Sequence, residues 1–224
     1  MAPDLGERLA TVQGRIVDAA VRAGRDADAI TTIVVTKFHP PQLVRDLYAL
    51  GVRDFGESRH QEAQPKIAEL DDVSATWHFI GQLQSKKARQ VRAYADVIHS
   101  VDRESLVDAL TGPEGQLDVF IQLNLTDDPD RGGAQPTALE PLVERVTGAP
   151  GLRLLGVMAV APLGAEPRAA FEAVRALSER VVAIAPGASA LSMGMSGDYE
   201  DAILEGATHL RIGTAITGNR PVQG

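Results

Sequence analysis

The chain has 224 residues, of which 44% are hydrophobic and only 4% aromatic. A core built from Val, Ile, Leu and Ala suits the buried strands of a parallel sheet. The formal net charge of −8 argues against a surface that binds nucleic acid or an anionic membrane. Because the chain contains no cysteine, a disulfide framework and a thiolate metal site are excluded.

The first segment predicts an amphipathic helix. Residues 4–24 place apolar side chains at helical spacing. Charged residues are spread through this segment, so it lacks the apolar core of a signal peptide. We therefore expect a soluble, cytoplasmic protein.

From residue 31 onward, strand-like and helix-like segments alternate. The predicted strands are 31–37, 52–56, 76–81, 96–101, 117–124, 152–161, 189–193 and 208–213. Segments with helical periodicity lie between them, among others at 43–50, 85–95, 139–146, 168–184 and 199–205. Eight strands with intervening helices predict an α/β fold, a single (β/α)8 TIM barrel spanning residues 1–224 with an extra N-terminal helix. A doubly wound open sheet is the alternative, since periodicity alone does not close a sheet.

Lys37 stands at the end of the first apolar run and is followed by Phe38-His39-Pro40-Pro41. Lysine is rarely buried without a partner, and a drier site lowers its pKa toward that of a nucleophilic amine. Such an amine forms Schiff bases with carbonyl compounds or with pyridoxal phosphate. The alternative is that Lys37 extends from the strand end into solvent.

The loops after the seventh and eighth strands predict an anion site. In a barrel these two loops commonly hold phosphate. Ser196 offers a hydroxyl in a glycine-containing loop, while Gly213 and Thr214 offer backbone amides and a second hydroxyl. Helix capping is the alternative role of the two hydroxyl side chains.

Arg211 alternates with Leu210 and Ile212 in the last strand, so it points into the barrel if those two pack outward. A guanidinium there needs an acceptor, and an internal salt bridge with a barrel carboxylate is one alternative. Since the eighth strand of a closed barrel neighbours the first, Lys37 and the anion loops would lie together. Jointly they predict a pyridoxal phosphate site.

Six segments carry a family resemblance. They are Val35-Thr36-Lys37, Phe55-Gly56-Glu57, Trp77 to Lys87, His99-Ser100-Val101-Asp102, Leu191-Ser192-Met193-Gly194-Met195-Ser196 and Arg211-Ile212-Gly213-Thr214-Ala215-Ile216. Over about residues 31 to 220 the chain resembles the pyridoxal phosphate homeostasis proteins of the YggS/PROSC type. The resemblance implies a barrel like the N-terminal domain of alanine racemase, with pyridoxal 5'-phosphate as the cofactor.

The resemblance also implies roles for individual residues. Lys37 would form the Schiff base, and Arg211 would be the partner of the pyridine nitrogen. Ser196, Gly213 and Thr214 would hold the phosphate. His78 and Asn124, each predicted at a strand end, are weaker candidates for the face of the cofactor, and His78 could equally be a core histidine.

Two acidic residues and one substitution near the second strand are left open. Solvated or capping roles on the second helix are expected for Glu57 and Glu62, with general bases as the alternative. Where the family has asparagine after Phe-Gly-Glu, this chain has Ser58. Residues 127–133 follow a strand end and would form either a lid or an ordinary solvated loop.

An arginine beside the pyridine nitrogen disfavours protonation of the ring and weakens it as an electron sink. Alanine racemases add a second domain whose tyrosine is one of two opposed bases, whereas Tyr48, Tyr94 and Tyr199 of this chain all fall in predicted helices. We therefore expect a non-catalytic, monomeric carrier of pyridoxal phosphate that supplies apoenzymes and binds neither nucleic acid nor membrane. An amino-acid racemase or related Schiff-base enzyme, and a barrel aldolase acting through Lys37, are the alternatives.

Overall fold

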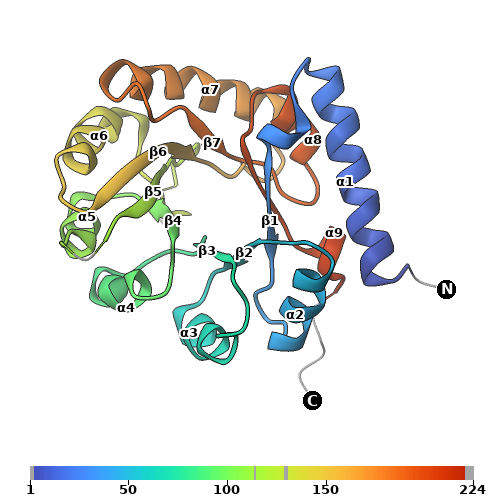
Figure 1. Cartoon of the computed structure of the whole chain (residues 1–224). Coiled ribbons are helices and arrows are strands. Elements are labelled where there is room, and N and C mark those ends of the chain that lie inside the picture. Colours follow the sequence, from blue (N-terminus) through green and yellow to red (C-terminus); the bar gives the residue numbers. More distant parts are fainter. Residues whose placement is uncertain (1–2, 114, 129–130, 220–224) are drawn as a thin grey trace.

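The computed structural model describes residues 3–113, 115–128 and 131–219. Its parallel strands form a closed barrel in chain order, in which β8 pairs with β1 (Figure 1). The strands are β1 (Thr31–Val35), β2 (Asp54–Glu57), β3 (Thr76–Phe79), β4 (Val97–Val101), β5 (Leu117–Gln122), β6 (Leu152–Met158), β7 (Ala190–Ser192) and β8 (His209–Ile212). The predicted barrel is confirmed, and the open-sheet alternative is wrong.

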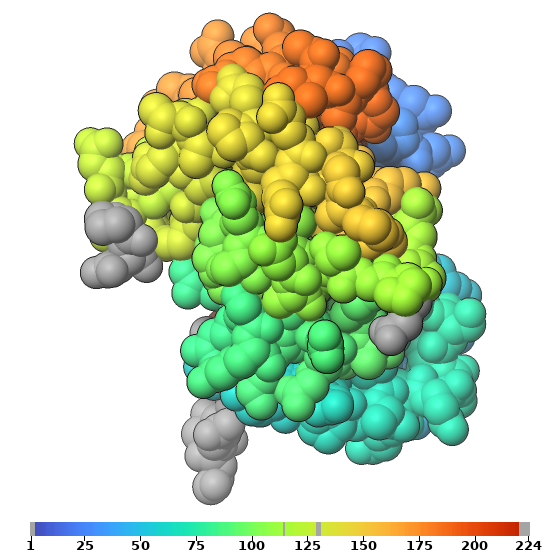
Figure 2. All heavy atoms as spheres, turned by 90° about the vertical axis from the view of Figure 1, so that its left-hand side faces the viewer, coloured from blue at the N-terminus to red at the C-terminus, as the bar shows by residue number. Residues whose placement is uncertain are grey.

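Helices surround the barrel and follow one another around it in chain order, as the outer surface shows from α4 and α5 through α6 to α7 (Figure 2). The α-helices are α1 (Leu5–Arg22), α2 (Pro41–Ala49), α3 (His60–Glu69), α4 (Ala88–Arg92), α5 (Glu104–Leu110), α6 (Leu139–Thr147), α7 (Pro167–Ile184), α8 (Tyr199–Leu204) and α9 (Thr214–Thr217). Short 3-10 helices are η1 (Ala27–Ala29), η2 (Ser85–Lys87) and η4 (Pro136–Ala138). No helix in the described part of the chain is long and apolar enough to span a membrane.

Successive side chains of each strand point alternately to the outside of the barrel, where the helices pack, and into its interior. Outward-facing side chains such as Val34, Phe55 and Ile98 pack with the helices in one extended aliphatic core. Inside the barrel, Phe120 and Met158 belong to a small separate cluster. Polar side chains, among them His99, Ser192 and Arg211, also occupy the interior.

The predicted N-terminal helix is confirmed as α1, which begins with a capping box. The carboxylate of Asp4 accepts from the backbone N–H of Glu7 at 2.8 Å, and the Glu7 carboxylate accepts from the backbone N–H of Asp4 at 3.0 Å. Further along, Arg15 and Arg22 bind Glu200 at the start of α8. The extra helix therefore packs against the last two helices, α8 and α9 (Figure 1).

Several strands end earlier than the sequence pattern predicted. β1 ends at Val35, so Lys37 lies in the following turn rather than in the strand, and β6 ends at Met158 rather than at residue 161. The segment 127–133, expected to be either a lid or an ordinary solvated loop, includes residues 129 and 130, which lie outside the described residues. Its role stays a prediction.

Candidate functional site

A hollow of about 520 Å³ opens at the carboxyl ends of the strands, where catalytic and binding sites of such barrels are found. Residues following six of the strands contribute to it. Its lining consists of Val35, Lys37, Ser58, Ile80, Gly81, Met158, Val160, Met195, Ser196, Gly197, Arg211, Gly213 and Thr214. The structure therefore brings five of the predicted site residues, Lys37, Ser196, Arg211, Gly213 and Thr214, to one place.

The charge of this hollow is opposite to the charge of the whole chain. Lys37 and Arg211 supply its basic groups, and none of the described residues that line it carries a carboxylate. Ile80, Met158 and Val160 give it apolar walls. Two cations, hydroxyl groups and apolar walls suit a small ligand that combines a flat apolar ring with an anionic group.

The chain is fixed in conformation on both sides of Lys37. After it, Phe38 adopts a positive φ of 68°, a conformation that is uncommon for a residue with a side chain and is often found at functional sites. The Lys37 amine lies 5.9 Å from the centroid of the Phe38 ring. The chain therefore turns sharply at the point where the amine enters the hollow.

Before Lys37, a buried polar cluster holds the end of β1. The Lys66 amine donates to the backbone oxygen of Thr36 at 2.9 Å and to Glu57 Oε1 at 2.7 Å, and the Thr36 hydroxyl donates to the same carboxylate oxygen at 2.8 Å. The side chains of Lys66 and Glu57 are only 7% and 1% exposed. The expectation of a solvated or capping Glu57 is therefore wrong, because α3 covers it and supplies a cation. Glu62 pairs with Arg59 at 3.1 Å outside the hollow.

The two predicted anion loops contact each other. Ser196 Oγ accepts a hydrogen bond from the backbone N–H of Ala215 at 3.2 Å, so the loop after β7 is joined to the start of α9. At Gly213 an added Cβ would meet Val35 only at ordinary contact distance, 3.6 Å. The absence of a side chain there leaves room in the hollow beside Ser196 and Thr214.

Arg211 points into the barrel as its alternation predicted. It is 4% exposed and donates to Ser192 Oγ at 2.6 Å and to the backbone oxygen of Ala159 at 2.8 Å. Among the described residues it forms no ion pair with a carboxylate, so the alternative of an internal salt bridge is wrong. Burial lowers the pKa of Arg211 to about 10, which leaves it cationic at neutral pH.

His78 and Asn124 do not line this hollow. His78 is buried in β3, where its ring contacts Asp54 and His99, each at 3.0 Å. Asn124 is also buried, and its amide donates to the backbone oxygen of Asp128 while its oxygen accepts from the backbone N–H of Thr126. It lines a neighbouring hollow between the loop after β5 and α7. A direct contact of either residue with a ligand stays a prediction.

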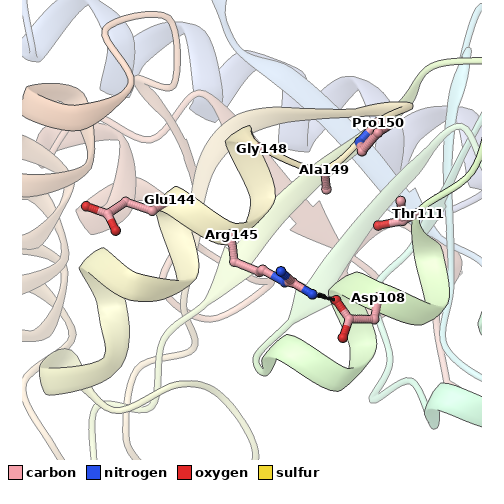
Figure 3. Close-up of a pocket in the computed structure, with 7 residues that line it drawn as sticks. All are labelled: Asp108, Thr111, Glu144, Arg145, Gly148, Ala149 and Pro150. Atoms are coloured by element: carbon pink, nitrogen blue, oxygen red, sulfur yellow. Dashed lines mark hydrogen bonds and ion pairs between the residues drawn. The ribbon is translucent and has the colours of Figure 1, made fainter.

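A further hollow of about 350 Å³ lies between the C-terminal ends of α5 and α6 (Figure 3). These helix ends lie at the opposite end of the barrel from Lys37, which follows the carboxyl end of β1. Arg145, the cation of this hollow, forms an ion pair with Asp108, and Glu144 points away from that pair. Because the guanidinium is already neutralised, this hollow lacks the positive character of the one beside Lys37.

None of the three tyrosines lines the hollow beside Lys37. Tyr48 lies in α2 and Tyr199 in α8, whereas Tyr94 lies in the turn after α4 rather than in a helix. Burial raises the pKa values of Tyr94 and Tyr199. The chain therefore offers no tyrosine as a base at this site.

Sequence reasoning missed the residues behind Arg211. Ser192 and His99 are fully buried and lie in hydrogen-bond contact with each other at 2.8 Å. The signal was a polar residue in an otherwise apolar strand, as for His99 in Val97-Ile98-His99. Gly81 was also missed as a structural requirement: its added Cβ would lie 2.0 Å from the backbone oxygen of Ser58.

Comparison with known proteins agrees with this geometry. The profile of the alanine racemase N-terminal domain family matches residues 27–221. A pyridoxal phosphate homeostasis protein of Pseudomonas aeruginosa is 42% identical over 220 residues, covering 96% of each chain. The protein of the same name from Escherichia coli is 37% identical and covers 97% of each chain.

Solved structures give the same result. The structure of PipY from Synechococcus elongatus without PLP has a TM-score of 0.84 at 35% identity, and the match covers 96% of this chain and 100% of PipY. The structure of PipY with PLP bound has a TM-score of 0.82 at 34% identity, with the same coverage. Alanine racemase of Corynebacterium glutamicum shares the fold, with a TM-score of 0.69 at 16% identity, and this chain spans 62% of its length. The chain therefore belongs to the alanine racemase N-terminal domain family and, within it, to the pyridoxal phosphate homeostasis proteins.

Proposed function

We propose that this chain binds pyridoxal 5'-phosphate in the hollow beside Lys37 and takes part in intracellular supply of the cofactor without catalysing a reaction of its own. The observation that carries the proposal is the convergence of Lys37, Arg211 and the two anion loops on one hollow without a carboxylate. The name of the relatives and the PLP-bound structure of PipY support it. Transfer to apoenzymes, a monomeric state, a cytoplasmic location and a single binding domain spanning residues 1–224 are parts of the same proposal.

The residues of the hollow fit the groups of this cofactor. The Lys37 amine would hold its aldehyde carbon covalently, with loss of one water molecule. Ser196, Thr214 and the backbone N–H groups near Gly213 would donate to its phosphate. Arg211 would donate to its ring nitrogen. When bound, the cofactor supplies an electrophilic carbon and an electron-withdrawing ring.

Three features of the site favour holding over turnover. Because a cationic Arg211 disfavours a second positive charge nearby, it would keep a ring nitrogen beside it unprotonated, which weakens electron withdrawal by the ring. Among the described residues, the lining of the hollow also includes no carboxylate and no tyrosine to serve as a second base opposite Lys37. An amino acid whose amine displaces Lys37 would therefore keep the proton on its α-carbon.

Binding is tested on the purified protein by its visible absorption and by borohydride reduction followed by peptide mapping. We expect a coloured protein in which Lys37 carries the reduced cofactor, and a colourless Lys37→Arg variant. Lys86→Arg, which changes an exposed lysine, is the matched control and should stay coloured. A tag at Lys86 or Lys87 would contradict the assignment, and a colourless wild-type protein would favour a barrel aldolase.

The absence of catalysis is tested with L-alanine in deuterated water. Proton NMR should show little deuterium at the α-carbon, and chiral chromatography should show little D-alanine. Replacing Arg211 by Glu should increase any residual exchange in protein that still binds the cofactor, because a carboxylate favours a protonated ring nitrogen. Rapid racemisation by the unmodified protein would overturn the carrier and establish the racemase alternative.

A further inference from the structure

An unbroken row of polar side chains crosses the barrel interior behind Arg211. Its links are Arg211 Nη1 to Ser192 Oγ at 2.6 Å, Ser192 Oγ to His99 Nδ1 at 2.8 Å, His99 Nε2 to His78 Nδ1 at 3.0 Å, and His78 Nε2 to Asp54 Oδ1 at 3.0 Å. The side chains come from β8, β7, β4, β3 and β2, and so from both sides of the barrel. The row starts at the hollow and ends at Asp54, the first residue of β2.

When both rings are neutral, the chemistry of the two ends determines the direction of every hydrogen bond. A guanidinium can only donate, a carboxylate can only accept, and a neutral imidazole donates from one nitrogen and accepts at the other. Ser192 therefore accepts from Arg211, and Asp54 accepts from His78 Nε2. His78 then accepts at Nδ1 from His99 Nε2, and His99 accepts at Nδ1 from the hydroxyl of Ser192. All the hydroxyl and ring protons of the row point the same way.

Burial makes this arrangement costly to break. His99 and Ser192 are fully buried, and His78 and Arg211 are 3% and 4% exposed. Burial, above all, holds the pKa of His99 well below its usual range, so His99 is neutral as the row requires. A neutral ring with one defined tautomer can accept from Ser192 at one nitrogen and donate at the other.

We propose that Ser192, His99, His78 and Asp54 are positioning residues that orient Arg211 toward the ring nitrogen of the bound cofactor. The strength of this one hydrogen bond then depends on a carboxylate at the far end of the barrel. The inference rests on the proposed function. Arg211 has no carboxylate partner among the described residues, so Ser192 and the backbone oxygen of Ala159 are the acceptors that orient its guanidinium. Removing the hydroxyl of Ser192 leaves Nη1 of that guanidinium without this acceptor.

The test compares two ligands. One is pyridoxal phosphate, and the other is the analogue in which a C–H group replaces the ring nitrogen. Both keep the aldehyde and the phosphate, so a change between variants in the ratio of dissociation constants, that of the analogue divided by that of pyridoxal phosphate, reports the contact with Arg211. In Ser192→Ala we expect binding of pyridoxal phosphate to weaken roughly tenfold or more, as when other supporting hydrogen bonds are removed, while binding of the analogue changes little.

Ser100→Ala is the matched control, since Ser100 is also a buried serine of the barrel and its hydroxyl has no hydrogen-bond partner within the described residues. It should keep the wild-type ratio. At the far end, Asp54→Leu should lower the ratio, whereas Asp54→Asn retains an oxygen that accepts from His78 and should restore most of it. These variants remain informative if Ser192→Ala folds poorly.

The outcomes separate the two proposals. A wild-type protein that binds neither ligand would refute the proposed function. A wild-type protein that prefers pyridoxal phosphate, with the same preference in Ser192→Ala and Asp54→Leu, would refute the positioning row and leave the proposed function intact.

Discussion

The buried ion pair behind Lys37 can be tested by removing only its cation. In Lys66→Met the length of the side chain is kept, but Glu57 loses the amine that lies 2.7 Å from its carboxylate. Because the two side chains are 7% and 1% exposed, solvent cannot replace the lost partner. Removing one member of a buried pair costs about 3–5 kcal/mol. The hydroxyl of Thr36 still donates to Glu57, so we expect the lower part of this range.

The assay is urea denaturation at pH 7, supported by thermal unfolding. For a chain of this size the expected loss corresponds to a fall in Tm of about 6–20 °C. Lys86→Met, which changes an exposed lysine, is the control and should stay within about 0.5 kcal/mol of the wild type. The double variant Glu57→Gln with Lys66→Met leaves no unpaired charge and should be more stable than Lys66→Met alone. A loss below about 1 kcal/mol in Lys66→Met, or a double variant no more stable than the single one, would refute the reasoning.

Three further predictions concern pH, backbone geometry and ligand binding. Burial lowers the pKa of His209 to about 4, so the unfolded chain takes up a proton below about pH 6.5 that the folded protein refuses. The free energy of unfolding should therefore fall by up to about 3 kcal/mol as the pH drops from 6.5 to 4, and urea denaturation of His209→Asn should show a flatter profile across this window. Gly156 has a φ of 154°, and its added Cβ would lie 1.9 Å from a backbone oxygen of β7. Gly156→Ala should unfold at much lower urea concentration or fail to accumulate, whereas Gly187→Ala, where no atom lies within 4 Å, should be as stable as the wild type. Ser196→Ala combined with Thr214→Val removes hydrogen bonds to a charged group, each worth about 1.5–3 kcal/mol. Fluorescence titration should show binding of pyridoxal phosphate weakened at least about tenfold and binding of pyridoxal weakened much less, and equal losses would place the phosphate elsewhere.

Local pattern alone accounted for the order of the elements and for the ingredients of the site. Alternating strand and helix periods predicted a (β/α)8 barrel, because each period reports which side of an element is buried. Lys37 was recognisable because a charged residue follows directly on an apolar run. Ser196, Gly213 and Thr214 were recognisable because small polar residues follow strand ends, where a backbone can approach an anion.

Closure of the barrel determined which of those residues lie together at one site. Pairing of β8 with β1 places Arg211 and Lys37 at one hollow, although more than half of the chain separates them. No local pattern reports such a contact, since periodicity describes one element at a time. The strand ends were also predicted two residues too late at β1 and three too late at β6, where backbone hydrogen bonds from Thr36 to Gly56 and from Ala159 to Ser192 continue just past the strands.

The environments of Glu57 and His78 were decided by tertiary structure as well. Glu57 was expected in a solvated or capping role, but α3 covers it and supplies Lys66 as its partner. His78 was a candidate for the face of the cofactor, yet its ring lies between Asp54 and His99. A side chain's residue type and position predict which partners it can accept, and only the packing of elements distant in the chain determines which partner it has.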